Sequence, residues 1–401
     1  MAPTRSFDPR DPEFRTDPHR FFARLRREDP LHWNPHLKAY ALTRHRDVFQ
    51  VLRHPHFLAT PMRANTATLL RRSGRSLPTL DRLIEAAVLF DSTPGHREAR
   101  RMLVATLNMR PLGEYAPLMA DVTDRLIDAL RGRPSFDAVS DFADPLPVHV
   151  IHRVLGIPEE LFDTLRAATW GLDGLFNYVK AIRELVAWDA QCRTGFAVID
   201  DLVRQRRAAP REDGITRMIA LAAQDGIDHE RLVARIFFLI MVASDTTSAT
   251  IGNAIALALA TPGIVDAITD PATTAAAVEE LLRLEGTALF AARYADRDTE
   301  LAGLAVPEGT VAYCYLAAAN RDPEAYPDPD RFVAGRGGPP HFAFGDGIHA
   351  CIGASFARLE ARIALHAFFT RLGPLRRVEA GTSWLPLDAF RHLARLPVAV
   401  D

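Results

Sequence analysis

The sequence predicts a mainly α-helical protein with small β-sheets, folded as a single domain over residues 1–401. Most of the chain places apolar residues at positions i, i+3 and i+4, a spacing that gives a helix one apolar face. Segments of strand-like composition are few and short. No stretch rich in glycine, serine or proline divides the chain and no segment repeats along it, so nothing marks a domain boundary.

The helical spacing recurs along the whole chain. The predicted helices are Pro18–Arg27, His96–Leu107, Ala116–Leu130, Leu146–Leu155, Ala181–Arg206, His229–Ala260, Ala272–Glu285 and Gly353–Leu372. Three short apolar segments are flanked by turn residues, which is typical of strands. These predicted strands are Leu31–Trp33, Ala39–Thr43 and Val311–Leu316.

The composition excludes several classes of protein. Hydrophobic residues make up 48% of the chain and charged residues 24%, as in ordinary globular domains. The 48 basic and 50 acidic side chains leave a net charge of −2, which favours neither nucleic acid nor an anionic membrane as a partner. Residues 1–15 lack the apolar stretch of a signal peptide, and the longest apolar runs are far shorter than the ~20 residues that span a bilayer. We expect a cytoplasmic protein that binds neither nucleic acid nor membrane.

The predicted helix His229–Ala260 is unusually long. It follows Asp228, a favourable N-cap residue, and stops before Pro262. At 1.5 Å per residue it would run about 48 Å, enough to cross the molecule. Its centre, Ile236–Ala243, is apolar on all sides, which indicates burial throughout.

A polar run, Ser244–Ser248, follows this apolar centre and contains a carboxylate and four hydroxyls. Such groups in a buried helix are costly unless they form hydrogen bonds, hold water or face a cavity. The hydroxyls can instead bond to the carbonyls four residues earlier and only bend the helix. From the residues alone, both interpretations remain open.

The glycine-rich loop Pro339–Gly353 leads into the last predicted helix and contains Cys351. At a helix start, the positive end of the helix dipole favours the thiolate over the thiol. A thiolate is a metal ligand or a nucleophile, and His349 is a candidate base, so a cysteine hydrolase remains open. Zinc is disfavoured because no second cluster supplies ligands. The other cysteines, Cys192 and Cys314, lie far away in sequence, which fits a reducing compartment without a disulfide framework.

The loop resembles the haem-binding loop of the haem-thiolate monooxygenases, the cytochrome P-450 superfamily, in its soluble bacterial form. The signature Phe-x-x-Gly-x-x-x-Cys-x-Gly is filled by Phe344, Gly347, Cys351 and Gly353. The segment Val242–Thr247 resembles the family's oxygen-activation segment, with Val and Ala in its first two places.

Further matches extend this resemblance from about Pro18 to Val398. Glu280 and Arg283 match the family's Glu-x-x-Arg pair, and Pro329–Phe332 resembles the segment whose arginine, here Arg331, joins that pair. The positions that match the family's partners of the haem propionates are His96, Arg100, Arg293 and His349.

The resemblance implies a cytochrome P-450 fold with a long central helix over haem b. Cys351 is then the axial ligand of the iron, and a thiolate ligand favours cleavage of the O–O bond. Asp245 and Thr246 are the implied catalytic pair that delivers the protons consumed when dioxygen is split. Thr246 would hold a water, and Asp245 would connect it to solvent.

The implied substrate pocket is mostly apolar. Its expected lining segments are the loop before His96, Trp170–Tyr178, Phe238–Val242, Thr287–Ala292 and Leu385–Phe390. Within them we single out Phe238, Met241, Val242, Leu289 and Phe290. Thr287 departs from the family, in which many bacterial members have proline a few residues after the Glu-x-x-Arg motif. This departure predicts an unusual backbone path for Thr287–Ala292, and with it a different shape of the pocket.

The sequence contains no Gly-x-Gly-x-x-Gly after a strand, no phosphate loop and no metalloprotease or hydrolase signature. We therefore expect no flavin or NAD(P)H on this chain and an external supply of electrons from a ferredoxin and its ferredoxin reductase. Arg358 and Arg362 are candidates for the docking of that partner.

The expected function is O2-dependent hydroxylation or epoxidation of a hydrophobic small molecule, such as an intermediate of natural-product biosynthesis. One alternative is a different haem-thiolate oxidation, such as aryl or C–N coupling, nitration or decarboxylation. Another is a non-catalytic helper homologue. Such homologues tend to lose the cysteine or the Glu-x-x-Arg pair, and this chain contains both.

Overall fold

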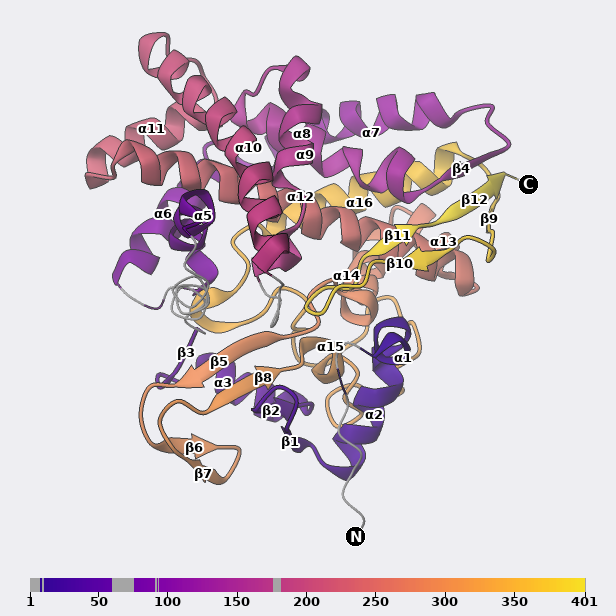
Figure 1. The fold of residues 1–401 in the computed structure, drawn as a ribbon. Helices are drawn as coiled ribbons and strands as arrows, with labels where there is room; N and C mark the ends of the chain where they lie inside the picture. Colours follow the sequence, from indigo (N-terminus) through magenta and orange to yellow (C-terminus); the bar gives the residue numbers. More distant parts are fainter. Residues whose placement is uncertain are drawn as a thin grey trace.

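The computed structural model describes residues 8, 11–59, 76–90, 92, 94–175 and 182–400. Helices dominate these residues and the sheets are small, so the predicted fold class is confirmed. In Figure 1 helices α7 to α12 and α16 form the upper part of the molecule, and the largest sheet lies below them.

Each predicted helix is present, with ends that differ by at most a few residues. The α-helices are α1 (Pro12–Thr16), α2 (Pro18–Glu28), α3 (His45–Arg53), α5 (Pro78–Ala86), α6 (Pro94–Leu107), α7 (Ala116–Leu130), α8 (Pro145–Leu155), α9 (Phe162–Thr169), α10 (Ile182–Ala208), α11 (Gly214–Asp225), α12 (His229–Ala260), α13 (Ile264–Thr269), α14 (Thr274–Glu285), α15 (Leu316–Ala319) and α16 (Ala354–Arg371). The shorter helical turns are η1 (Val88–Phe90), η2 (Leu112–Tyr115), η3 (Val139–Ala143), η4 (Glu159–Leu161), η5 (Leu172–Leu175) and η6 (Gly347–His349). The predicted start of α10 at Ala181 lies outside the described residues.

The strands are short and come from distant parts of the chain. They are β1 (Leu31–Asn34), β2 (Ala39–Leu42), β3 (Phe57–Ala59), β4 (Ser135–Asp137), β5 (Ala291–Ala295), β6 (Thr299–Leu301), β7 (Leu304–Val306), β8 (Val311–Cys314), β9 (Leu375–Arg377), β10 (Ser383–Trp384), β11 (Leu393–Arg395) and β12 (Pro397–Val400). The largest sheet has the order β1-β2-β8-β5-β3, in which only β2 and β8 pair in parallel. The predicted strand Val311–Leu316 is too long, because α15 begins at Leu316.

Helix α12 forms the centre of the main hydrophobic core. The Asp228 carboxylate caps its start by accepting from the amide of Arg231 at 2.8 Å. Helices α5, α8, α10, α14 and α16 pack against it. Within the described residues α12 is the one helix long and apolar enough to cross a membrane, but 78% of its most apolar stretch is buried in the protein. Its hydropathy is therefore that of a core helix.

The segment between β10 and β11 returns to α12. Asn253 on α12 donates a hydrogen bond through Nδ2 to the carbonyl of Arg391 at 2.9 Å. The amide of Arg391 donates to the carbonyl of Thr287 at 2.8 Å, and Ala288 pairs with Phe390 in an isolated bridge. These bonds hold the segment after α14 and the β10–β11 segment against the middle of α12.

Candidate functional site

The cysteine loop is held in a defined conformation. The amide of Cys351 donates to the carbonyl of Phe344 at 2.8 Å. Gly347 has a φ of +70°, and a Cβ at that position would lie 2.4 Å from the carbonyl oxygen of Leu52. A side chain there would meet both backbone strain and a backbone clash. At Gly353, by contrast, a Cβ would meet nothing within 4 Å. Of these two glycines, contacts within the described residues require only Gly347.

The pKa of the Cys351 thiol is raised, contrary to the direction expected from the helix start. Solvent reaches the side chain, yet the surrounding protein displaces enough water to disfavour the thiolate. The amide of Gly353 and the charges of Arg100 and Arg358 act in the opposite direction. A metal cation at the sulfur would supply the missing stabilisation of the thiolate.

The other two cysteines behave as structural residues. Cys192 and Cys314 are completely buried. Burial raises the pKa of Cys314 to about 12, so this side chain is a neutral thiol at physiological pH.

The four predicted propionate partners include a buried basic cluster beside the loop. The rings of His96 and His349 lie 4.5 Å apart, and Arg100 donates to the carbonyl of Ala350 at 2.8 Å. Arg293 is 6% exposed, and burial lowers its pKa. The described residues supply no carboxylate to Arg100 or Arg293. A ligand with anionic groups would satisfy both cations.

The ring of His349 also indicates that a ligand is bound beside the cysteine loop. Both of its nitrogens are buried and form no hydrogen bond with the described residues. Burial, reinforced by Arg293, His96 and Arg100, lowers its pKa to about 3. Haem carries two propionate carboxylates and an iron that accepts a thiolate, so it fits the orphaned polar atoms and Cys351 alike. A neighbouring cleft of about 730 Å³ is lined by His96, Arg97, Arg100, Arg101 and Ile348, with Ser92, Val104 and Ala105.

Asp245 and Thr246 lie on α12 at the edge of a small cavity. The Thr246 hydroxyl donates to the carbonyl of Val242 at 2.7 Å, as the structural interpretation of the polar run predicts. Asp245 accepts from the amides of Gly171 and Leu172 at 3.0 and 2.9 Å, both at Oδ2. Burial raises the pKa of Asp245 to about 6, although those two amides and His392 lower it.

The cavity beside this pair has a volume of about 40 Å³. Its lining residues are Trp170, Gly171, Leu172, Asp245, Thr246, Thr287, Leu385, Leu387, Phe390 and His392. A single water occupies about 30 Å³ in the liquid, so the cavity is large enough for one.

Thr287 explains how the segment after α14 follows α12 without the family's proline. Its hydroxyl lies 2.8 Å from that of Thr250 and donates to the carbonyl of Thr246 at 3.3 Å. Proline has no hydroxyl to form these bonds, so threonine at this position ties the segment to the helix.

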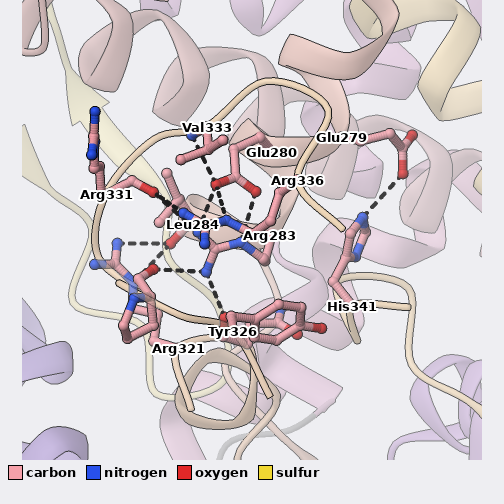
Figure 2. Close-up of polar contacts among 12 residues, drawn as sticks. Glu279, Glu280, Arg283, Leu284, Arg321, Tyr326, Arg331, Val333, Arg336 and His341 are labelled. Carbon is pink, nitrogen blue, oxygen red and sulfur yellow. Dashed lines mark hydrogen bonds and ion pairs between the residues drawn. The ribbon is translucent and has the colours of Figure 1, made fainter. Parts of the chain in front are cut away.

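The Glu280–Arg283 pair is buried and bidentate, with both distances 2.8 Å (Figure 2). The structure corrects the role expected for Arg331. The guanidinium that joins Glu280 belongs to Arg336, at 2.8 Å, and Arg331 contributes only its main-chain carbonyl, which accepts from Arg336 at 2.6 Å. The amide of Val333 also donates to Glu280, at 3.1 Å.

The residues singled out for substrate binding pack mainly in the protein interior. Phe238 and Met241 belong to the main core around α12, and Val242 is half-buried at its edge. Leu289 and Phe290 belong to a second core cluster near the largest sheet. None of the five lines the cavity of about 40 Å³. Parts of the expected lining, at 60–75, 91, 93 and 176–178, lie outside the described residues.

The candidate docking arginines differ in their surroundings. Arg358 is bound to Glu279 at 2.6 Å and lies over the ring of Phe344, so it supports the cysteine loop. Arg362 is exposed. Arg97 on α6 is also exposed and lines the cleft beside Ile348, whose side chain is 60% exposed.

Comparison with known proteins agrees with this geometry. A family model described as Cytochrome P450 matches residues 266–373. The chain is 31% identical to Cytochrome P450 107B1 of Saccharopolyspora erythraea, over 97% of this chain and 96% of that protein. It is 30% identical to Cytochrome P450 monooxygenase PikC of Streptomyces venezuelae, over 96% and 92%. The solved structure of P450BioI in complex with hexadec-9Z-enoic acid ligated acyl carrier protein is similar with a TM-score of 0.89 and 28% identity, over 97% and 99% of the two chains. Identity at this level over nearly the full length, with the same backbone fold, shows that the chain belongs to the cytochrome P450 family.

Proposed function

We propose that this protein is a haem-thiolate monooxygenase that uses O2 to hydroxylate or epoxidise a hydrophobic small molecule. The observation that carries the proposal is a basic group beside Cys351. Arg100 and Arg293 have no carboxylate partner among the described residues, and both nitrogens of His349 lack a hydrogen bond there. This group requires an anionic ligand, and the adjacent sulfur requires a cation. Haem b satisfies both requirements.

Each residue near this ligand has a distinct role. Haem b, bound through the Cys351 thiolate, supplies the redox centre that activates dioxygen. Arg100 and Arg293 bind the propionates, since a guanidinium suits the geometry of a carboxylate. His96 and His349 complete that contact. Phe344 packs under the Arg358 guanidinium and keeps the loop in place.

Asp245 and Thr246, on α12, handle the protons that the splitting of dioxygen consumes. The Thr246 hydroxyl gives its own proton to the carbonyl of Val242, so its oxygen remains free to accept from a water. With a pKa of about 6, Asp245 gains and loses protons near neutral pH, as a relay requires.

Two cysteine variants test the ligand assignment. Cys351→Ala should abolish the long-wavelength Soret band that the reduced carbonyl complex shows with a thiolate ligand. Cys314→Ala is the control and should retain this band, because its buried thiol is neutral and is not the ligand in this assignment. Retention of the band in Cys351→Ala with loss in Cys314→Ala would reverse the assignment.

Product analysis tests the reaction. We propose that the substrate is an intermediate of natural-product biosynthesis, oxidised in the cytoplasm with electrons from a ferredoxin and a ferredoxin reductase. Incubation under 18O2 should place one labelled oxygen in the product. A coupled, nitrated or decarboxylated product without that label would support the alternative haem-thiolate reactions, and no product would support a helper role.

The similarity to P450BioI bound to an acyl carrier protein supports a second form of substrate. A hydrophobic acyl chain can reach such a site while attached to its carrier. Offering hexadec-9-enoic acid both free and linked to an acyl carrier protein distinguishes the two modes. A spectral shift of the haem with only one form identifies the mode that this pocket accepts.

A further inference from the structure

Three polar side chains meet next to Asp245. They are Asp144 at the start of α8, Ser248 on α12 and His392 just before β11. The Ser248 hydroxyl donates to Asp144, and His392 Nε2 lies 3.4 Å from Ser248 Oγ and 3.5 Å from Asp144 Oδ1. The His392 side chain is 6% exposed and that of Asp144 is 14% exposed. The cluster therefore extends from the surface into the core.

The structure holds His392 in a fixed position. Its neighbour Arg391 is bound through the main chain to Asn253 and Thr287, and the His392 ring packs 5.3 Å from the ring of Trp170. A side chain fixed on several sides loses little further entropy when it transfers a proton.

A serine, a histidine and an aspartate in contact also suggest a hydrolase, but their arrangement excludes one. In a hydrolytic triad the aspartate and the serine contact opposite nitrogens of the ring. Here Asp144 and Ser248 both contact Nε2, and the Ser248 hydroxyl donates to the carboxylate rather than to the ring. Ser248 is also 2% exposed, out of reach of a substrate.

The cavity of about 40 Å³ connects this cluster to Asp245. His392 and Asp245 both line it, together with Thr246. Both hydrogen bonds that Asp245 accepts from the described residues end at Oδ2, which leaves Oδ1 for a water in the cavity. The charged groups that act on Asp245 are His392 and Asp144, from the β11 and α8 sides respectively.

We propose that His392 is the relay residue that carries protons from Asp144 to Asp245. The inference rests on the proposed monooxygenase function and adds to it the route by which protons enter. Asp144 takes a proton from solvent and passes it to His392 Nε2. The imidazole releases a proton from Nδ1 to the cavity water, and that water gives one to Asp245. Exchange of the proton with water restores the starting tautomer without rotation of the ring.

His392→Gln tests the relay in the holoenzyme with a ferredoxin and its reductase. Glutamine keeps hydrogen-bonding atoms but does not take up a proton at neutral pH. We expect turnover to fall about 100-fold, the lower end of what a positioned proton donor contributes, with KM unchanged and a larger solvent deuterium isotope effect. His152→Gln on α8 is the matched control, since His152 is fully buried and does not line the cavity. Wild-type turnover and isotope effect in His392→Gln would overturn the proposal.

A second readout does not depend on turnover. In the reduced carbonyl holoprotein, the pH titration of the Asp245 13Cγ resonance, assigned with Asp245→Asn, reports its pKa. Because His392 lowers and Asp144 raises that pKa, His392→Gln should move the midpoint above its starting value and Asp144→Asn should move it below. Unchanged midpoints in both variants refute the coupling on which the relay depends. If both variants shift the midpoint as expected but the wild type forms no oxygenated product, the monooxygenase function is refuted and the coupling between these residues stands.

Discussion

Thr246 forms a hydrogen bond within its own helix, as a structural residue does, but it also lines the cavity beside Asp245, where a catalytic residue would lie. Its bond to the Val242 carbonyl contributes about 1 kcal/mol to stability, so Thr246→Ala should fold and bind haem and substrate. Without its oxygen as an acceptor, water beside Asp245 is no longer held in place. We expect NAD(P)H oxidation, driven through the redox partners, to continue while product falls and hydrogen peroxide rises.

Thr123→Ala on α7 is the control for this prediction. Thr123 is 1% exposed and donates to the carbonyl of Met119 at 2.7 Å, which is the same bond in another helix. It should lose similar stability without change in the ratio of product to NAD(P)H consumed. Equal ratios in the wild type and Thr246→Ala would show that the hydroxyl has only its structural role.

Asp245 gives a pH-dependent prediction. Its pKa is about 6 in the folded protein against an ordinary 3.8, so the folded state binds this proton more tightly than the unfolded state. The contribution is complete at low pH and is lost as pH rises from about 4 to 6. The free energy of unfolding of the wild type should therefore fall relative to that of Asp245→Asn by about 3 kcal/mol over this range. Urea unfolding of both proteins at pH 4, 5, 6 and 7 measures the difference, and a constant difference contradicts the raised pKa.

The sequence pattern identified Cys351, Asp245 and Thr246 because each lies in a segment with its own local signature. It did not identify His392 or Asp144, since an isolated histidine and an aspartate before a proline are common at surfaces. The return of the chain after β10 brings His392 to α12, and the packing of α8 against α12 brings Asp144 there. Ser248 was visible as part of the polar run, but its partners were not.

At the scale of elements, Glu280 ties α14 to the loop that contains Val333 and Arg336. The expected third member, Arg331, precedes Arg336 by five residues in the same loop, and composition does not distinguish the two arginines. Which guanidinium reaches Glu280 is decided by the path of that loop, over which Val333 also donates its amide.

Substitution separates the two arginines. Arg336→Ala removes a hydrogen bond to a buried carboxylate and should lower the free energy of unfolding by about 2 kcal/mol. Arg331→Ala leaves the main-chain carbonyl in place and removes an exposed side chain, so a change within about 0.5 kcal/mol is expected. Urea unfolding and haem content measure both effects. Larger destabilisation by Arg331→Ala than by Arg336→Ala would restore the original expectation.

The long elements were predictable and the short ones were not. Helix α12 combines an N-cap at Asp228, a following proline and a long apolar stretch, so both of its ends coincide with the prediction. Strands β3 and β5 contain few residues, and their pairing depends on partners far away in sequence. Helix α11 was missed although Asp213 caps it, and the contact of that carboxylate with the buried Arg206 of α10 is visible only in the fold.

At the scale of the whole molecule, net charge says little about docking, because the balance of −2 hides local basic surface. Exposed Arg97 beside exposed Ile348 forms such a surface at the cleft near the haem partners. We expect Arg97→Glu to slow turnover driven by an acidic ferredoxin several-fold at low salt and less at high salt. Arg27→Glu on α2, another exposed arginine, should not. Equal rates for Arg97→Glu and the wild type at low salt would place the docking surface elsewhere.

The bonds from Gly171 and Leu172 to Asp245 also connect the opening of the turn after α9 to the proton on that carboxyl. Burial disfavours the ionised carboxylate more than these two amides favour it, so the pKa is higher with the turn in place than it would be in water. By linkage, protonation favours the state in which the turn covers Asp245, and ionisation favours separation. With a pKa of about 6, this change occurs within the range that cells experience. Mild acid therefore closes the turn over Asp245, and a rise in pH loosens it.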